Sequence, residues 1–474
     1  MATDRTEPMD VNLHDINLDD INFDDEAAQV QEKKATKKAP AKAKAKSQSK
    51  SQAAAKEQGS KIGEFIEDFG HYLVDTFGWQ KGPQAVFDRT LLFTVMLLVA
   101  YGFVMIASAS MPVGERIYSN HYHFIMRHGV FICLALVAAA IVVQVPMEKW
   151  QKYNGFLLLS SILLLIVVLL IGRTVNGAQR WIVLGPINIQ AAEPAKLFFF
   201  AYLSSYLVRK HEEVLTHVKG FAKPLVVFFV AAVLLLKQPD LGTVVVMFIT
   251  TLSLLFLAGA KLWQFFALIL TGVSAIGLLI WMEPYRVNRI TSFLDPWADP
   301  YGTGYQLTQS LMAYGRGDWF GQGLGNSVQK LAYLPEAHTD FVMAVLAEEL
   351  GLIGVLAILA LLLIVVFKAM LIGQKALKNG RAFEGYFALA IGVWFSFQTM
   401  VNVGGTAGAL PTKGLTFPLV SYGGSSLIVM FIAVAVLLRI DHELRMCNLH
   451  ILSSWSILSS TATAINITIK LLPP

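Results

Sequence analysis

Two aspartates, each followed by a proline, lie close together in the longest polar segment between apolar runs: Asp295-Pro296 and Asp299-Pro300. A carboxylate in such a segment can act as a general base or as a ligand of a divalent cation. The residue before a proline is pushed out of helical geometry, and residues 301–306 (Tyr-Gly-Thr-Gly-Tyr-Gln) continue the turn-forming composition. From spacing alone, a chemical role and simple capping of turns are equally good interpretations.

Three arginines accompany these aspartates in the same segment: Arg286, Arg289 and Arg316. A guanidinium group presents a planar fork of donors that matches a phosphate group. An isolated arginine in such a segment is more often simply solvated. The composition therefore allows a phosphate site here but does not establish one.

A second polar cluster surrounds the start of an apolar run near residue 191. Its members are Arg173, Asn176, Gln179, Arg180 and Trp181, followed by Glu193 and Lys196. Glu193 and Lys196 are three residues apart, so on a helix they share one face and can pair. Ionisable groups inside a bilayer are costly and usually face a cavity, which favours a functional role. A purely structural ion pair is the alternative.

A third set of candidates lies near the last apolar runs. His338 and Asp340 are predicted to begin a helix, where two residues so spaced do not face each other, and a structural histidine is as good an interpretation as a catalytic one. Lys413 precedes residues 421–426 (Ser-Tyr-Gly-Gly-Ser-Ser), a patch of small residues that permits close helix contact. Packing explains the glycines and serines, but not Lys413.

Membrane helices must position these residues. The chain has 474 residues, of which 55% are hydrophobic and 15% charged, more apolar surface than one soluble core buries. Apolar runs of about 20 residues recur, and runs of that length in hydrocarbon form helices. The predicted fold class is therefore all-α and polytopic, with ten transmembrane helices. The spans are approximately 89–110, 127–145, 153–172, 191–208, 222–236, 242–259, 262–282, 338–368, 384–404 and 418–438.

The chain before the first span has two parts. Residues 1–60 are acidic and then rich in Lys, Ala, Ser and Gln, a composition that predicts a disordered tail. Nine lysines lie between Lys33 and Lys56, so the net charge of +5 belongs to this tail and no nucleic-acid partner is expected. Residues 61–80 carry apolar side chains at helical spacing, which indicates an amphipathic helix on the membrane surface.

Basic residues recur in alternate connections between the spans. By the positive-inside rule, this pattern places both termini in the cytoplasm. The connection 284–337, between the seventh and eighth spans, is then on the outer side, and loops of that length are commonly functional. The predicted domains are the tail 1–60, the helix 61–80, the membrane domain 89–440 and a cytoplasmic C-terminal tail 441–474.

The order of these motifs resembles the SEDS family (shape, elongation, division and sporulation) from about Arg89 to Arg445. The matching segments are residues 172–181, 193–196, 238–243, the loop of Asp299, and 421–426. Residues 410–416 and the long charged N-terminal tail resemble the division member of the family more than the elongation member. Residues 449–474 depart from the family pattern and contain no clear span.

The resemblance implies a SEDS fold and an inverting peptidoglycan glycosyltransferase that polymerises lipid II into glycan strands at the outer face of the bacterial inner membrane, at the division septum. Asp299 matches the family's essential aspartate, as base or as ligand of a divalent cation (Mg²⁺ or Mn²⁺), with Asp295 as the fallback. The further substrate-binding residues that it implies are Glu193, Lys196, Arg173, Arg180, Lys413, His338 and Asp340.

The resemblance also implies partners, namely a class B penicillin-binding protein (the division transpeptidase) and periplasmic divisome regulators. Three alternatives stay open at this point. A lipid II flippase would also suit many spans and intramembrane charges, but needs no base at Asp299. An elongation polymerase would run the same chemistry elsewhere in the cell, and a scaffold would need no chemistry.

Overall fold

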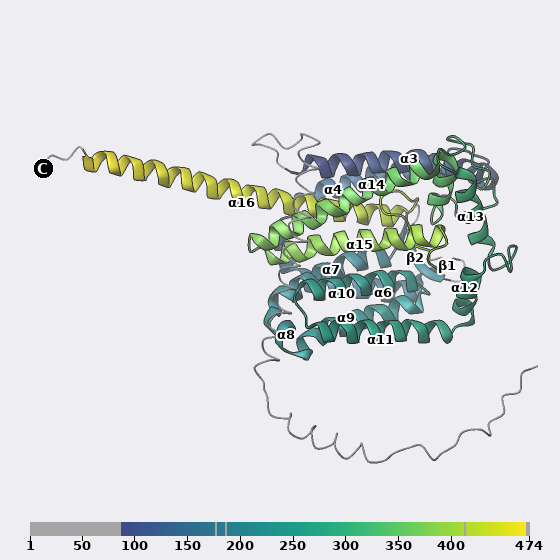
Figure 1. The fold of residues 1–474 in the computed structure, drawn as a ribbon, viewed down its shortest axis with the longest axis horizontal. Coiled ribbons are helices and arrows are strands. Elements are labelled where there is room, and N and C mark those ends of the chain that lie inside the picture. Colours follow the sequence, from purple (N-terminus) through teal and green to yellow (C-terminus); the bar gives the residue numbers. More distant parts are fainter. Residues whose placement is uncertain (1–86, 176–177, 185–186, 412–413, 471–474) are drawn as a thin grey trace, which may run out of the picture. The chain divides into compact units, whose positions relative to one another are not determined.

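The computed structural model describes residues 87–470, except 176–177, 185–186 and 412–413, and shows a bundle of long helices with a small sheet at one end (Figure 1). The predicted tail 1–60 and amphipathic helix 61–80 lie outside the described residues. The helices are α3 (Arg89–Tyr118), α4 (His123–Val142), α5 (Met147–Lys152), α6 (Asn154–Ile171), α7 (Ala192–Arg209), α8 (His211–Thr216), α9 (Val218–Lys237), α10 (Leu241–Leu257), α11 (Leu262–Trp281), α12 (Pro284–Leu294), α13 (Tyr305–Gly317), α14 (Val342–Lys378), α15 (Ala382–Thr406) and α16 (Gly424–Lys470).

Ten of these helices coincide with the ten predicted spans, so the all-α polytopic fold is confirmed. Among the described residues, seven are long and apolar enough to cross a membrane: α3, α4, α6, α9, α14, α15 and α16 up to Cys447. The other three predicted spans are α7, α10 and α11, of which α10 is a short apolar helix.

Local signals explain where several helices begin. The Asp88 carboxylate caps α3 by accepting a hydrogen bond from the Leu91 amide at 3.0 Å. The Asp240 carboxylate caps α10 in the same way, accepting from the Thr243 amide at 3.2 Å. The turn of residues 238–240 thus ends α9 and starts α10.

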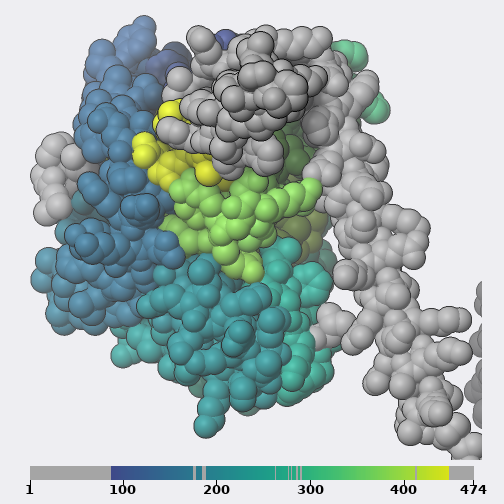
Figure 2. All heavy atoms as spheres, turned by 90° about the vertical axis from the view of Figure 1, so that its left-hand side faces the viewer, coloured from purple at the N-terminus to yellow at the C-terminus, as the bar shows by residue number. Residues whose placement is uncertain are grey.

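The bundle has a packed centre and an apolar outer surface. α15 lies in the middle, where it packs against α14, α7 and α10, and its Trp394 is fully buried. Outer helices expose large apolar side chains, such as Phe156 and Leu170 on α6. A bilayer is the solvent that such a surface requires. Figure 2 views the bundle from the end opposite the sheet, where α16 (yellow) lies beside the turn between α14 and α15 (light green).

Four regions differ from the sequence prediction. Residues 173–190 form a three-stranded antiparallel sheet rather than a loop: β1 (Arg173–Val175), β2 (Ala178–Leu184) and β3 (Ile187–Gln190). The connection 284–337 contains α12 and α13, which lie across the sheet end of the bundle (Figure 1). α14 begins at Val342 instead of 338, and α16 continues as one helix to Lys470. The strands are too short for a visible alternation, and they are stabilised by pairing with each other and by packing against α6 and α16.

Candidate active site

A cavity of about 1310 Å³ lies at the sheet end of the bundle. Five segments far apart in sequence form most of its walls: the end of α3 with the start of α4, strands β2 and β3, the α9–α10 turn, residues 332–341, and residues 411 and 414–426. Its volume exceeds the roughly 300–1,000 Å³ of sites for small ligands. Its ionisable residues include Arg116, Arg127, Arg180, Asp240, Glu283, Glu336, His338 and Asp340. Because the lining carries both cationic and anionic side chains beside apolar ones, such a space suits a large amphiphilic ligand with charged groups.

Arg180, a predicted substrate-binding residue, lies on β2 and lines this cavity. The register of the sheet places its neighbour Trp181 opposite Gln190 of β3. The Arg180 Nε donates to the Gln238 carbonyl at 3.1 Å, and its Nη2 donates to the Pro239 carbonyl. The guanidinium therefore ties the sheet to the α9–α10 turn. Because both acceptors are neutral carbonyls, these bonds do not cancel its charge.

His338 and Asp340 also reach the cavity, from a turn before α14 and not from a helix. The His338 ring packs against Phe124 and Tyr422, with ring centroids 4.8 and 5.5 Å away. Its buried Nδ1 has no hydrogen-bond partner among the described residues. Burial lowers the pKa of His338, with an opposing effect of a nearby carboxylate, so the ring is neutral near pH 7. Asn402 holds this turn by donating to the Asp340 carbonyl at 2.9 Å.

Asp340 and Arg180 approach the same point of the cavity wall, at Gly414. A Cβ atom on Gly414 would lie 3.0 Å from Asp340 Oδ2 and 3.8 Å from Arg180 Nη1. A side chain there would crowd both groups. The neighbouring Lys413 lies outside the described residues, so its predicted role stays a prediction. Tertiary structure thus brings together Arg180, His338 and Asp340, which sequence spacing alone did not connect.

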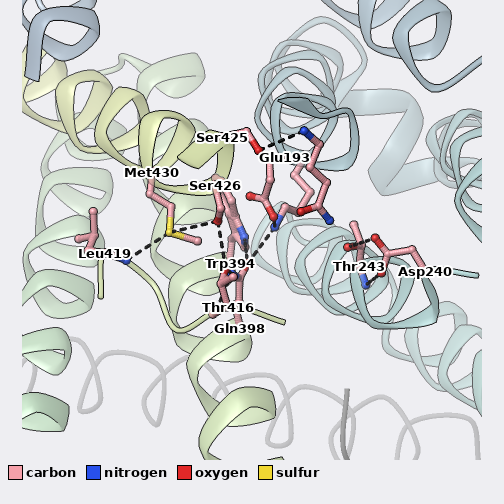
Figure 3. A network of polar contacts seen from close by, with 12 residues as sticks. Glu193, Asp240, Thr243, Trp394, Gln398, Thr416, Leu419, Ser425, Ser426 and Met430 are labelled. Carbon is pink, nitrogen blue, oxygen red and sulfur yellow. Dashed lines mark hydrogen bonds and ion pairs between the residues drawn. The ribbon is translucent and has the colours of Figure 1, made fainter. Parts of the chain in front are cut away.

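Glu193 and Lys196 form the predicted ion pair, at 3.1 Å, but lie buried behind the cavity wall rather than on it. The Lys196 ammonium also donates to Gln398 Oε1 at 2.9 Å and lies over the Trp394 ring. Gln398 in turn donates to the carbonyl of Thr416, which lines the cavity, at 2.9 Å. Figure 3 shows Trp394, Gln398 and Thr416 close together in this network. The pair therefore supports the wall from behind.

Asp299 is exposed and lies in the loop between α12 and α13. Its Oδ2 accepts hydrogen bonds from the Thr303 amide at 2.8 Å and the Thr303 hydroxyl at 3.2 Å, and its carbonyl accepts from the Gly304 amide. The carboxylate therefore caps the turn, and both described bonds engage Oδ2. Asp299 does not itself line the cavity, whereas Glu283 and Gln306, on either side in sequence, do.

The remaining candidates are spread around the site. Arg173 lies on β1 with an exposed side chain and does not line the cavity. Arg316 lies 3.6 Å from Glu348 and is also outside the lining. The side chains of Arg286 and Arg289 are not among those the structure describes.

No group of three or more His, Cys, Asp or Glu side chains arranged for a metal ion occurs in the described part of the chain. A closed protein site for a divalent cation is therefore not found there. Mg²⁺ is commonly held by one or two carboxylates together with substrate phosphates. The exposed carboxylate of Asp299 fits a role of that kind.

Several residues that line or support the cavity escaped sequence reasoning. Gln398 and Asn402 are four residues apart on α15 and hold two parts of the cavity wall. The sequence did contain a signal for them, namely two amide side chains one helical turn apart within an apolar span. Arg116 and Arg127 line the cavity from α3 and α4, near the ends of two predicted spans. Nothing in their spacing connected them with residues two hundred positions away.

The profile of a protein family described as "Cell cycle protein", which groups FtsW, RodA and SpoVE, matches residues 88–446. This match covers most of the chain, and its limits agree with the described helix bundle. The chain therefore belongs to the SEDS family of membrane proteins.

Within that family, the chain is similar to proteins named "Probable peptidoglycan glycosyltransferase FtsW". The protein of Alteromonas naphthalenivorans is 65% identical over 366 residues, which are 77% of this chain and 71% of that protein. The protein of Pseudoalteromonas translucida is 62% identical, over 77% of this chain and 92% of its own. An Escherichia coli protein is 56% identical, over 78% and 91%. This sequence identity places the chain in the FtsW branch of the family.

Two solved structures share the fold. A chain from a peptidoglycan synthase complex that couples polymerization and crosslinking has 29% sequence identity and a TM-score of 0.61, covering 76% of this chain and 98% of that one. The rod shape determining protein RodA of Thermus thermophilus has 28% identity and a TM-score of 0.57, covering 78% and 99%.

Proposed function

We propose that this chain is a peptidoglycan glycosyltransferase that polymerises lipid II into glycan strands for septal wall synthesis during cell division. The observation that carries the proposal is the large cavity at one end of a membrane bundle, lined by Arg180, His338 and Asp340. A lipid-linked sugar needs a polar hollow that opens beside hydrocarbon. The names of the relatives at 56–66% identity support the same activity.

The reaction is a displacement at the anomeric carbon of the lipid-linked donor. The acceptor 4-hydroxyl forms the new C–O bond, the bond to undecaprenyl pyrophosphate breaks, and the configuration inverts. The Asp299 carboxylate takes the hydroxyl proton, and Thr303 orients it through the two hydrogen bonds to Oδ2. Asp299 is in a loop next to residues that line the cavity, where an incoming sugar would arrive.

The pyrophosphate leaving group gains negative charge as its bond breaks. Arg180 can supply a counter-charge on the cavity wall, since its described bonds go to neutral carbonyls. In the alternative role, Asp299 would hold a divalent cation, which would supply charge neutralisation for the pyrophosphate when bound. The neutral His338 lines the cavity, and a small rotation of its ring would bring the buried, unpaired Nδ1 within reach of a sugar or peptide donor. Asp340 would contact the substrate near Gly414, and Lys413, directly before it, would add a second cation.

The cavity end of the bundle is proposed to face the periplasm, with both termini in the cytoplasm. The basic residues of alternate connections support this orientation. A class B penicillin-binding protein is the proposed partner, supported by the structural likeness to a chain of a peptidoglycan synthase complex. Periplasmic divisome regulators would act on this pair.

The test is glycan synthesis from lipid II by the full-length chain in nanodiscs, with and without its transpeptidase partner. We expect Asp299→Ala to lower the rate by about 100-fold or more, the scale of a lost general base. Asp295→Ala is the matched variant, because it changes another aspartate-proline pair in the same loop; a rate within about threefold of wild type assigns the base to Asp299 alone.

Two results would contradict the proposal. Polymerisation by Asp299→Ala at the wild-type rate would remove the assigned base. Transfer of lipid II across vesicle membranes by wild type, lost in Asp299→Ala and without any glycan product, would favour a flippase.

A further inference from the structure

Two adjacent carboxylates, Glu348 and Glu349, are buried near the start of α14 and belong to no part of the cavity wall. Both residues are 0% exposed. The helical geometry of α14 breaks two residues later at Gly351, with φ 66° and ψ −169°. Glycine adopts such a conformation without the steric cost that a side chain adds. The break leaves backbone groups that need partners from outside the helix.

Residues 318–323, which follow α13, supply those partners. The Gln322 amide donates to the Glu348 carbonyl at 2.9 Å, on one side of the break. The Leu352 amide donates to the Asp318 carbonyl at 2.8 Å, on the other side. The connection after α13 is thus bonded through its backbone to the interrupted helix.

The Glu348 carboxylate fixes the next part of that connection. It accepts hydrogen bonds from the Val328 amide at 3.0 Å, from the Gln329 amide at 3.2 Å and from the Ser327 hydroxyl. Arg316, near the end of α13, lies 3.6 Å away. One buried carboxylate therefore bonds residues 327–329 and reaches the last turn of α13.

The Glu349 carboxylate fixes the following residue and joins it to another helix. It accepts from the Lys330 ammonium at 2.6 Å and from the hydroxyl of Ser108 on α3 at 2.7 Å. The Lys330 ammonium also donates to the Ser108 hydroxyl at 2.8 Å. The three groups form a closed triangle, in which each contacts the other two.

We propose that Glu348 and Glu349 are positioning residues for the proposed glycan polymerisation. Lys330 lies two residues before the wall segment 332–341, which carries His338 and Asp340. Arg316 lies at the far end of α13, whose other end follows the Asp299 loop. The two carboxylates therefore fix both halves of the site to α14. A displacement of about 1 Å in the groups that bind or act on a substrate can lower the rate about 100-fold.

The test uses the full-length chain with its transpeptidase partner in nanodiscs and two single variants, Glu349→Gln and Lys330→Met. Each leaves the other charge buried without its partner, so we expect kcat for lipid II polymerisation to fall about tenfold or more. The double variant Glu349→Gln/Lys330→Met buries no unpaired charge, and we expect it to recover at least about threefold over either single variant.

Hydrogen exchange separates positioning from general stability. We expect amides of residues 322–330 to exchange about tenfold faster in Glu349→Gln, while those of α7 and α15 stay as in wild type. Glu213→Gln is the control, because it removes a carboxylate of α8 that pairs with Lys210 and Lys223, and it should change neither readout. If wild type makes no glycan, the proposed function fails. The exchange pattern then still tests whether Glu349 holds residues 322–330 in place.

A wild-type kcat in Glu349→Gln would overturn the positioning role. So would faster exchange spread over α7 and α15, since the carboxylate would then stabilise the whole bundle and not the site. Ser108→Ala is a milder variant, because it removes the hydroxyl of the triangle and leaves Glu349 and Lys330 paired. We expect it to lower kcat about threefold.

Discussion

The cavity wall at the sheet end and the opposite end of the bundle treat their charged side chains differently. At the end opposite the sheet, Lys368 pairs with Asp88 at 2.9 Å, and Arg381 pairs with Glu443 at 2.6 Å. At the sheet end, the described bonds of Arg180 go to carbonyls, and His338 Nδ1 has no partner among the described residues. Charges matched within the protein stabilise the fold, while unmatched polar groups on a cavity wall are left for a ligand.

Glu443 shows how complete the matching is at the opposite end. Its carboxylate accepts from Arg381, from Arg439 at 2.8 Å and from the Met147 amide at 3.0 Å, which joins α5, α15 and α16. Such a network holds helices in place. The comparison therefore predicts that substitutions at this end change stability, and that substitutions at the sheet end change catalysis.

The largest effect expected at the opposite end is that of Lys368→Met. The change leaves the Asp88 carboxylate buried and unpaired, which costs about 3–5 kcal/mol of unfolding free energy. The rate of polymerisation per folded molecule should stay at the wild-type value, because this end is far from the cavity. Chemical unfolding in detergent and the lipid II assay measure the two quantities.

The double variant Lys368→Met/Asp88→Asn is the control for that experiment. It buries no unpaired charge, so much of the lost stability should return. A large loss of activity in Lys368→Met with unchanged stability would break the comparison between the two ends.

A smaller effect, on activity, is expected of Arg180→Ala. Loss of a charged donor to pyrophosphate should lower kcat/KM by about 10- to 100-fold, the scale of a hydrogen bond to a charged group. Arg180→Lys keeps the charge but not the planar fork, so its kcat/KM should lie between those of wild type and Arg180→Ala. If both variants retain full activity, the guanidinium serves only to tie β2 to the α9–α10 turn.

The smallest effect is expected of His338→Phe. Phenylalanine keeps the ring packing against Phe124 and Tyr422 but has no Nδ1 acceptor. KM for lipid II should rise about threefold to tenfold, the scale of one hydrogen bond between neutral groups, with little change in kcat. An unchanged KM would assign His338 to packing alone.

The same variant tests the lowered pKa of His338. A group whose pKa falls on folding contributes stability above its ordinary value of 6.5 and loses that contribution as the pH falls through the lowered pKa. Between about pH 7.5 and pH 5.5, wild type should therefore lose more thermal stability than His338→Phe. Equal losses would show that the ring is protonated without cost.

Some parts of the site followed directly from the sequence. The helices at the ten predicted spans and the Glu193–Lys196 pair depend on spacing along one helix; a helix lies at each predicted span, seven of them long and apolar enough to cross a membrane, and the pair forms. The surroundings of the pair were harder to predict. Spacing shows that the two residues meet, but not whether they face a cavity or Trp394 and Gln398. That depends on how α7 is rotated against α15.

By itself, the sequence determined the membrane class, the order of the helices, the family motifs and the candidate aspartate at 299. These follow from apolar run length, from proline geometry and from residues close together in the chain. Only the tertiary structure decided that Arg116, Arg180, His338 and Gly414 surround one cavity, that Lys196 supports it from behind, and that two glutamates of α14 hold the loop beside it. These contacts join segments tens to hundreds of residues apart, and helix packing, which no local pattern encodes, sets their geometry.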